Sequence, residues 1–317
     1  MNIVFLDRNS LAGDIRLAFD ALPSAQYREY SATLPEQVLA HAQDAEVLIS
    51  NKVQLPAAIL QALPCLRLVA VTATGVNNID LDAARAANIA VTHVRDYATH
   101  SVPEHVFAML LALQRNLLRY HQAIRAGAWS RADVFCLQTY SIDDLAGRTL
   151  GVIGGGTLGR AVLRLAEAFG MRTLLAERRE TTTLRPGRVA FHDVLEQSDV
   201  VSLHVPLTAD THHLIGRDAI ARMPSHAVMV NTSRGGVLDE AALLAALYSG
   251  GLGGACLDVL VQEPPPADHP LLGADLPNLI ITPHVAWASR QAQQTLVDEV
   301  VENIAAFLRG ESRNRVV

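Results

Sequence analysis

Three short segments in the last third of the chain carry side chains that can act on a carbonyl group beside a carboxylate. Arg234 lies in NTSRGG, Glu263 in DVLVQEP and His284 in ITPHVAW. A guanidinium can hold a carboxylate through two parallel hydrogen bonds, and an imidazole titrates near neutral pH, where an adjacent carboxylate favours its protonated form. Each residue alone would more often be structural, as a salt-bridging arginine or a strand-end histidine. Together they predict a carboxylate clamp (Arg234) and a general acid (His284) that is oriented by Glu263.

A glycine-rich turn in the middle of the chain predicts a dinucleotide-binding site. The segment TLGVIGGGTLGRAVLRLAEAFG places Gly154, Gly156 and Gly159 in the spacing G-x-G-x-x-G, after a strand-like run and before an amphipathic helix. The first two glycines allow a tight turn and close approach of a pyrophosphate, and the third lets the helix pack on the strand. The backbone amides of Thr157 and Leu158 are expected to face the anion at the helix N-terminus. The alternative, a tight turn without a ligand, is disfavoured because strand, glycines and helix agree.

The choice of coenzyme depends on Glu177, which ends the next strand-like run about 20 residues after the glycines. An acidic residue at this place binds the adenosine ribose hydroxyls and repels the 2′-phosphate of NADP. Arg178 and Arg179 follow directly and could accept that phosphate. The sequence therefore favours NAD as the cofactor and leaves NADP open.

The elements that must position these residues are short β-branched runs alternating with helical stretches, which predicts the α/β class with parallel sheets covered by helices. In the first third, strands are expected over Asn2–Leu6, Ala45–Ile49, Leu66–Val71 and Ile89–Thr92. Later strands are expected over Thr149–Ile153, Thr173–Ala176, Val200–His204, Ala227–Asn231, Gly254–Asp258 and Leu279–Thr282. Two doubly wound parallel sheets are therefore expected, and the three chemical segments fall outside the carboxyl ends of strands, where ligands bind.

The helical stretches suggest how the chain divides into domains. Helices are expected over Leu11–Ala21, Pro35–Ala42, Leu81–Ala87 and Val102–Leu118, the last opened by a capping box of Ser101 and Glu104. A final helix ends at Gly310 and carries on one face Val297, Val300, Val301, Ile304 and Leu308. Because a lone terminal helix needs a surface to cover, we expect it to return to the first sheet. The expected domains are 1–99 with 286–317, and 100–285.

Composition excludes several classes of protein. The chain of 317 residues is 50% hydrophobic and has a net charge of −6, which suits two packed domains and gives no electrostatic footprint for nucleic acid. Cys65, Cys136 and Cys256 are too few for a disulfide framework, and the adjacent His212 and His213 are expected to point in different directions, so no metal site is expected. Neither a membrane span nor a leader before the first strand is predicted, and a cytoplasmic location is expected.

Over essentially the whole chain, these motifs resemble the D-isomer-specific 2-hydroxyacid dehydrogenases. In that family the glycine turn, an N-x-x-R-G arginine, a glutamate before proline and a histidine in a T-P-H segment occur in this order, as they do here. The resemblance implies hydride transfer between NAD(H) and a small D-2-hydroxy acid or 2-keto acid, with Arg234, His284 and Glu263 in the roles given above. It also implies a flavodoxin-like substrate domain with an inserted Rossmann-type dinucleotide-binding domain, and a homodimer built largely from the central domains.

Further site residues follow from the resemblance. The segment TATGVNNID is similar to the family's loop for the substrate carboxylate, which implies substrate binding by Thr74, Gly75 and Val76. Asn51 and Lys52 follow a strand of the same sheet and are expected to reach the substrate, with an exposed lysine as the alternative. The remaining coenzyme contacts implied are His204, Val205 and Pro206 at the adenine and Thr232, Ser233 and Asp258 at the nicotinamide.

Within the family, Trp287 after the histidine looks most like the glycerate dehydrogenase or hydroxypyruvate reductase branch, so Trp287 is expected to contact the substrate. Hydroxypyruvate and D-glycerate are then the expected substrates, with glyoxylate a further one. Pro103 stands where relatives usually have alanine, and Glu177 replaces the usual aspartate. The alternatives are a dehydrogenase for another acid, such as 3-phosphoglycerate, and a dinucleotide-sensing protein like the corepressors that share this fold.

Overall fold

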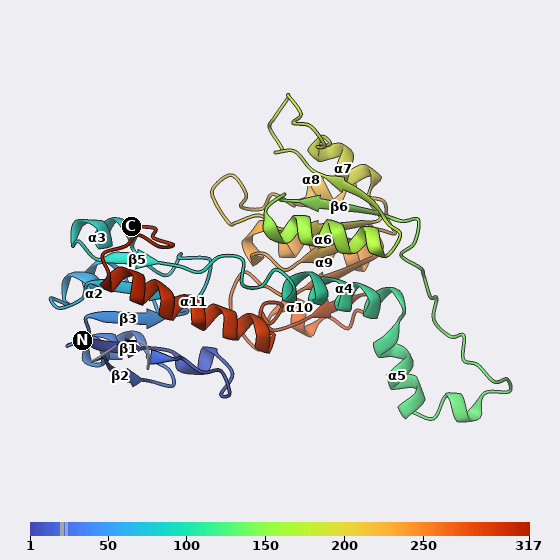
Figure 1. The fold of residues 1–317 in the computed structure, drawn as a ribbon. Helices are drawn as coiled ribbons and strands as arrows, with labels where there is room; N and C mark the ends of the chain where they lie inside the picture. Colours follow the sequence, from blue (N-terminus) through green and yellow to red (C-terminus); the bar gives the residue numbers. More distant parts are fainter. Residues whose placement is uncertain (20–21, 23–24) are drawn as a thin grey trace. The chain divides into compact units, whose positions relative to one another are not determined.

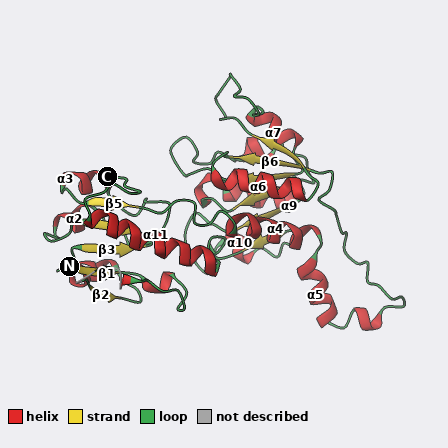
Figure 2. Cartoon of the chain, in the orientation of Figure 1, coloured by secondary structure: helices red, strands yellow, loops and turns green. Residues whose placement is uncertain are grey.

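The computed structural model describes residues 1–19, 22 and 25–317. The chain forms two compact units, Met1–Ala98 with Ala288–Val317, and Thr99–Trp287. Both units are α/β with wholly parallel sheets, which Figure 1 traces along the sequence and Figure 2 colours by secondary structure. The predicted class, two parallel-sheet units of which the second is inserted in the first, is confirmed.

The first unit is built on a five-stranded sheet in the order β2-β1-β3-β4-β5. Its strands are β1 (Asn2–Phe5), β2 (Gln26–Glu29), β3 (Val47–Ser50), β4 (Leu68–Val71) and β5 (Ala90–Thr92). This is the flavodoxin-like order, whose topological switch point lies between β1 and β3. The sequence did not predict β2, because its residues QYRE are polar and mostly exposed at the sheet edge.

Helices of the first unit cover this sheet. They are η1 (Arg8–Ser10), η3 (Pro35–Gln37), α1 (Val38–Ala42), α2 (Ala57–Gln61), α3 (Leu81–Ala86) and α11 (Arg290–Leu308). The terminal helix α11 contacts β4 and buries Val297, Val300 and Ile304, as predicted. Leu308, expected on the same face, is exposed because the helix ends there, before Gly310 at φ 77°.

The helix predicted over Leu11–Ala21 is wrong for residues 11–18, which form a bend, a turn and irregular chain, and Phe19 is in a 3-10 turn. Positions 20 and 21 of that prediction lie outside the described residues. The Arg8 guanidinium explains the difference, since it donates hydrogen bonds to the carbonyls of Leu11, Ala12 and Ile15. Gln293 Oε1 accepts the Ala12 amide at 2.8 Å. These bonds take the backbone groups that a helix would pair internally.

The second unit contains a six-stranded sheet in the order β11-β10-β9-β8-β6-β7. Its strands are β6 (Thr149–Ile153), β7 (Arg172–Leu175), β8 (Val200–Leu203), β9 (Val228–Asn231), β10 (Gly254–Leu257) and β11 (Leu279–Ile281). A parallel bridge between Ala176 and Val189 continues the sheet beyond β7. With that bridge as the third strand, the order begins 3-2-1-4-5-6, as in Rossmann folds.

The long helix predicted over Val102–Leu118 is interrupted. The helices of this unit are α4 (Ser101–Gln114), α5 (Leu117–Arg125), η4 (Trp129–Arg131), α6 (Thr157–Ala168), α7 (Phe191–Gln197), α8 (Arg217–Ile220), η5 (Gly235–Val237), α9 (Glu240–Ser249) and α10 (Pro270–Gly273). Asn116, at φ 49°, separates α4 from α5. The predicted capping box is also wrong, because His100 is the N-cap and Ser101 Oγ instead donates to the Ala286 carbonyl.

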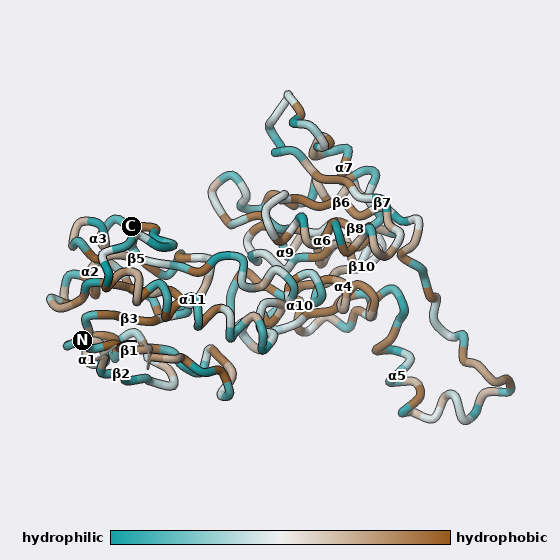
Figure 3. Tube along the Cα trace, viewed as in Figure 1, coloured by the Kyte–Doolittle hydropathy of each residue, from teal (hydrophilic) through white to brown (hydrophobic). Residues whose placement is uncertain are grey.

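Each sheet buries its own hydrophobic core, and buried strands such as β3 and β6 appear brown in the hydropathy colouring of Figure 3. In the first unit the core includes Val4, Leu48 and Val69. In the second it includes Val201 and Met229. Such apolar parallel strands, covered on both faces, fix the carboxyl edges from which polar loops emerge.

Candidate active site and dinucleotide site

The predicted chemical residues of the second unit follow three neighbouring strands. Arg234 lies three residues after β9, Glu263 lies in the loop after β10, and His284 lies in the loop after β11. Because β9, β10 and β11 are adjacent and parallel, their carboxyl ends share one edge of the sheet. The sheet therefore brings these segments to one side.

Glu263 and His284 form a direct pair, with His284 Nδ1 2.6 Å from Glu263 Oε2. The His284 side chain is 24% exposed and the Glu263 side chain 35% exposed, so both are half-buried but accessible from solvent. Glu263 Oε1 accepts the Leu260 amide at 3.0 Å, which fixes the carboxylate. The pairing uses Nδ1 and leaves Nε2 as the imidazole nitrogen for a reacting group.

Asn231 and Gly235 shape the loop that carries Arg234. Asn231 is fully buried; its Oδ1 accepts the Ser233 amide and hydroxyl, and its Nδ2 donates to the Arg234 carbonyl. A Cβ on Gly235 would lie 2.0 Å from the Leu260 carbonyl carbon, so only glycine lets the two loops touch. The Arg234 guanidinium donates to the Ser233 carbonyl at 2.7 Å. The asparagine and the glycine of the N-x-x-R-G segment are therefore explained by structure: Asn231 shapes the loop, and Gly235 lets it pack against the loop of Glu263.

Asp258, predicted as a nicotinamide contact, anchors the loop of His284. Its carboxylate is 1% exposed and accepts the amides of Val285 at 2.9 Å and Ala286 at 2.8 Å. Trp287, predicted to contact substrate, donates its indole N–H to the His284 carbonyl at 3.0 Å. Both residues thus hold the backbone around the imidazole.

The glycine turn joins β6 to α6 in the predicted way. A Cβ on Gly154, whose φ is 108°, would lie 2.3 Å from the His204 carbonyl oxygen, and one on Gly159 would lie 1.9 Å from the Gly154 carbonyl oxygen. A Cβ on Gly156 would meet no atom within 4 Å. Gly156 therefore borders open space at the N-terminus of α6, whose first residues are Thr157 and Leu158.

A cavity of about 890 Å³ opens beside this turn. The predicted coenzyme residues that line it are Gly154, Gly156, Glu177, His204, Val205 and Pro206. The Thr232 hydroxyl, predicted at the nicotinamide, is buried without a hydrogen-bond partner. A cavity of this size, an open glycine turn and an unsatisfied hydroxyl fit a bound dinucleotide. Ser233, by contrast, uses its hydroxyl on Asn231.

Glu177 is occupied in a way that the sequence did not predict. It is 3% exposed, and its carboxylate forms an ion pair with Arg185, whose Nε donates to Oε2 at 2.7 Å. The Arg178 amide donates to Oε1 at 2.8 Å. The Arg185 hydrogen bonds, then that of the Arg178 amide, lower the pKa of Glu177 to about 2. Binding of the ribose hydroxyls by Glu177 stays a prediction. Sequence reasoning missed Arg185, because its contact with Glu177 depends on how the loop after β7 folds back.

The predicted substrate residues of the first unit lie on two loops at the carboxyl edge of its sheet. Asn51 and Lys52 follow β3, and their amides donate to the Asp7 carboxylate at distances from 2.7 to 3.1 Å. Burial raises the pKa of Asp7, and this effect exceeds that of the amide hydrogen bonds, which lower it. Because Asp7 follows β1, this contact lies at the switch point of the sheet, the usual ligand position in such folds.

The second loop carries Thr74, Gly75 and Val76 after β4. Thr74 Oγ1 donates to the Val94 carbonyl at 2.8 Å, and the Thr74 carbonyl lies 2.7 Å from His93 Nδ1. These bonds hold the loop against the chain that follows β5.

Within the described residues, no three His, Cys, Asp or Glu side chains gather in a way that would hold a metal ion. None of the helices in the described part combines the length and apolar character of a membrane span.

The Rossmann-type sheet, the glycine turn and the contact between Glu263 and His284 are typical of a dinucleotide-dependent dehydrogenase. Residues 107–286 match the family model for the NAD binding domain of D-isomer specific 2-hydroxyacid dehydrogenases. The chain is 46% identical to a glycerate dehydrogenase from Methylorubrum extorquens over 99% of this chain and 98% of the relative. It is 34% identical to a hydroxypyruvate reductase from Blautia hydrogenotrophica, over 92% and 90% of the two chains.

A solved structure of an NADPH-dependent glyoxylate/hydroxypyruvate reductase from Sinorhizobium meliloti has a TM-score of 0.84 and 29% identity, covering 100% of this chain and 97% of that one. The chain belongs to the D-isomer-specific 2-hydroxyacid dehydrogenase family, and it is an oxidoreductase with an NAD-binding domain.

Proposed function

We propose that the protein interconverts hydroxypyruvate and D-glycerate with NAD(H), and that glyoxylate is a further substrate. The observation that carries the proposal is the 2.6 Å contact between His284 Nδ1 and Glu263 Oε2, which suits a general acid for a carbonyl oxygen. The similarity to a glycerate dehydrogenase and a hydroxypyruvate reductase supports this choice of substrate.

In the proposed reduction, the bound coenzyme supplies the hydride that reaches C2 of the keto acid. Arg234 holds the substrate carboxylate and polarises the carbonyl. His284 gives a proton from Nε2 to the carbonyl oxygen, so that C2=O becomes C2–OH. Glu263 stabilises the imidazolium before transfer and keeps the ring oriented through Nδ1.

Substrate and coenzyme contacts are proposed for the remaining predicted residues. Asn51, Lys52, Thr74, Gly75, Val76 and Trp287 bind the substrate beside Arg234 and His284. The coenzyme is held by Gly154, Gly156, Thr157, Leu158, Gly159, Glu177, His204, Val205, Pro206, Thr232, Ser233 and Asp258. The cavity beside the glycine turn supports the coenzyme assignment.

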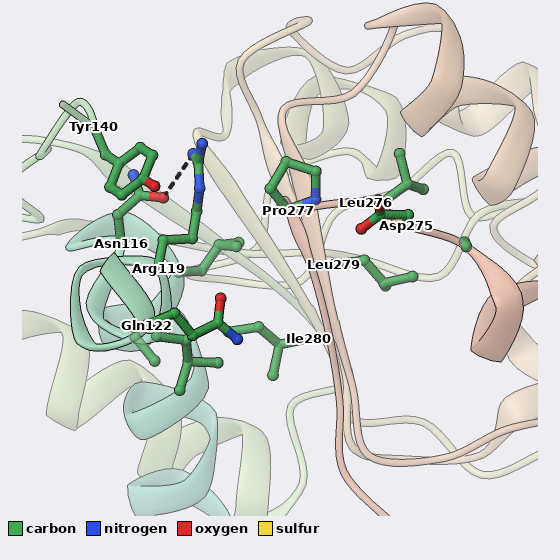
Figure 4. A pocket seen from close by; sticks show the side chains of 13 residues that line it. Asn116, Arg119, Gln122, Tyr140, Asp275, Leu276, Pro277, Leu279 and Ile280 are labelled. Carbon is green, nitrogen blue, oxygen red and sulfur yellow. Dashed lines mark hydrogen bonds between the residues drawn. The ribbon is translucent and has the colours of Figure 1, made fainter. Parts of the chain in front are cut away.

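We also propose that the protein is a homodimer joined through an arm, residues 117–144, that extends from the sheet of the second unit in Figure 1. The arm leaves apolar side chains exposed, namely Leu117, Leu118, Ile124, Trp129, Val134, Phe135 and Ile142. A pocket of about 300 Å³ lies between α5 and the start of β11. Figure 4 shows Arg119 and Tyr140 on one side of it and Pro277 and Leu279 on the other. A second copy would cover these apolar groups and fill the pocket.

A cytoplasmic location is proposed as well, supported by the three unpaired cysteines, which suit a reducing compartment. Cell fractionation with an antibody against the protein tests it.

The proposed activity is tested by initial rates of NADH and NADPH oxidation with hydroxypyruvate, glyoxylate, pyruvate and phosphohydroxypyruvate. We expect the highest kcat/KM with hydroxypyruvate. His284→Ala should lower kcat roughly 10²- to 10⁴-fold while the Kd for NADH stays unchanged, because the imidazole acts on the carbonyl. Phosphohydroxypyruvate as the best substrate would replace the proposed one, and dinucleotide binding without any turnover would favour a sensing protein.

A further inference from the structure

The backbone of His284 is held in an unusual conformation. Its φ is 55°, in the left-handed region that a histidine rarely adopts. The His284 amide donates to the Asp258 carbonyl at 2.8 Å and to the Thr282 carbonyl at 3.0 Å. Because such a conformation persists only when its surroundings impose it, the contacts around this loop decide where the imidazole points.

The buried Asp258 carboxylate provides much of that constraint. Besides the amides of Val285 and Ala286, its Oδ1 accepts the hydroxyl of Thr282 at 2.6 Å. A carboxylate that is 1% exposed is costly unless it is hydrogen-bonded and paired with a positive group. The side chain of His105, which is positive when protonated, lies beside this carboxylate, with Nε2 3.5 Å from Oδ1.

His105 reaches this carboxylate from a different element. It lies on α4, which contacts both β10 and β11. Its Nε2 is 2.9 Å from Thr282 Oγ1. Since the Thr282 hydroxyl hydrogen goes to Asp258, His105 Nε2 must be the donor in that bond. One chain of hydrogen bonds thus runs from His105 through Thr282 and Asp258 to the loop of His284.

We propose that His105 is a positioning residue for the general acid: it holds Thr282 and Asp258 so that the loop keeps His284 against Glu263. The effect on turnover rests on the proposed function of His284, whereas the effect on the loop does not. His105 touches neither substrate nor coenzyme in this proposal. Neither the sequence motifs nor the family resemblance assigned it a role.

Two matched pairs of variants test the proposal. His105→Leu removes the donor, whereas His105→Gln keeps an N–H at nearly the same place. Thr282→Val removes the hydroxyl at constant shape, whereas Thr282→Ser keeps it. We expect His105→Leu and Thr282→Val to lower kcat for hydroxypyruvate roughly 10- to 100-fold, since small misplacement of a reacting group is costly. The KM for hydroxypyruvate should stay within about twofold, and His105→Gln and Thr282→Ser should recover most of kcat.

Amide hydrogen exchange gives a readout that is independent of turnover. Peptides that cover Val285 and Ala286 should exchange faster in His105→Leu and Thr282→Val than in the wild type, and at the wild-type rate in the two conservative variants. Wild-type kcat with unchanged exchange in His105→Leu would overturn the proposal. So would equal losses in His105→Leu and His105→Gln. If the wild-type enzyme reduces none of the keto acids, the proposed function fails, and exchange alone decides the role of His105.

Discussion

Arg185 changes the charge balance of the cavity beside the glycine turn. Its guanidinium pairs with Glu177, and it lines the cavity together with Arg178, Arg179 and Arg188. A carboxylate at this place normally disfavours a 2′-phosphate by repulsion. Because Arg185 pairs with Glu177, that repulsion is reduced, and the nearby guanidinium groups would attract a 2′-phosphate, so the cavity suits NADPH beside the proposed NADH.

Removal of Arg185 should therefore change coenzyme selectivity. In Arg185→Ala we expect the Kd for NADPH to rise roughly tenfold or more relative to that for NADH, because the unpaired Glu177 carboxylate then repels the 2′-phosphate. Titration of each reduced coenzyme by its own fluorescence measures the two constants. Arg222→Ala, which removes a surface pair with Glu196, is the control. An unchanged ratio of the two constants would show that the pairing of Arg185 with Glu177 does not set coenzyme selectivity.

His204 gives the second unit a sensitivity to acid. Although the residue as a whole keeps some exposure, burial of its ring lowers the pKa to about 4. Ser202 Oγ lies 2.8 Å from His204 Nε2. In the unfolded chain His204 takes up a proton below about pH 6.5, whereas in the folded protein it does so only below about pH 4. The free energy of unfolding therefore falls as the pH drops from about 6.5 to about 4.

We expect this residue to contribute a loss of about 2 kcal/mol in the free energy of unfolding between pH 7 and pH 5. His204→Gln has no titrating group and should lose correspondingly less over the same interval. Urea unfolding at the two pH values, followed by circular dichroism, measures the difference. Equal losses in both proteins would mean that the imidazole takes up its proton in the folded state.

The sequence predicted that Arg234, Glu263 and His284 follow strands of one parallel sheet, and the structure brings Glu263 and His284 into direct contact at its carboxyl edge. It did not indicate Arg185 or His105. An arginine eight residues beyond Glu177 and a histidine within an apolar helix have no distinctive spacing. Which side chain folds back onto a carboxylate depends on the path of a loop, and local pattern does not fix that path.

At the scale of elements, two glycines of the β6–α6 turn have different roles: one is needed for folding and the other is proposed to serve coenzyme binding. Gly159 packs against the Gly154 carbonyl, whereas Gly156 borders open space where the pyrophosphate is proposed to lie. Alanine at these two positions should therefore act through different physical causes.

We expect Gly159→Ala to lower the free energy of unfolding by about 2–4 kcal/mol, since a Cβ there overlaps the backbone. Gly156→Ala should keep the wild-type melting temperature but raise the Kd for NADH roughly tenfold or more, because its methyl group occupies the space of the ligand. Differential scanning fluorimetry and NADH titration separate the two effects. A Gly156→Ala protein that binds NADH normally would place the pyrophosphate elsewhere.

Elements were predicted best where burial produces a strong pattern. The strands of both cores are continuous apolar runs, and β6 has the predicted bounds. The exceptions have local causes: β2 is a polar edge strand, Arg8 captures carbonyls of the expected helix at Leu11, and Asn116 breaks the apolar helix. Tertiary hydrogen bonds and a single left-handed residue outweigh helix propensity in these places.

At the scale of the whole molecule, the arm of residues 117–144 is the feature that a single folded chain leaves unexplained. Sequence patterns treat apolar residues as buried, yet Phe135 is 89% exposed and Val134 and Trp129 are also exposed. An apolar segment of this kind is stabilised when another surface removes it from water. The proposed homodimer supplies that surface through a second copy of the same arm.

If the arm joins two copies, Phe135→Glu should weaken the dimer. We expect sedimentation velocity to show a dimer of the 34.1 kDa chain for the wild type at micromolar concentration. The variant should have a dissociation constant at least roughly thirtyfold higher, corresponding to about 2 kcal/mol for an aromatic residue at the centre of an interface.

Tyr248→Glu, which alters an exposed aromatic residue on α9, is the matched control and should leave the dimer intact. A monomeric wild type, or equal dissociation constants for the two variants, would contradict an interface on the arm. Because Phe135 lies outside the proposed catalytic set, a monomeric variant that still binds NADH would also show that the dinucleotide site of the second unit forms within one chain.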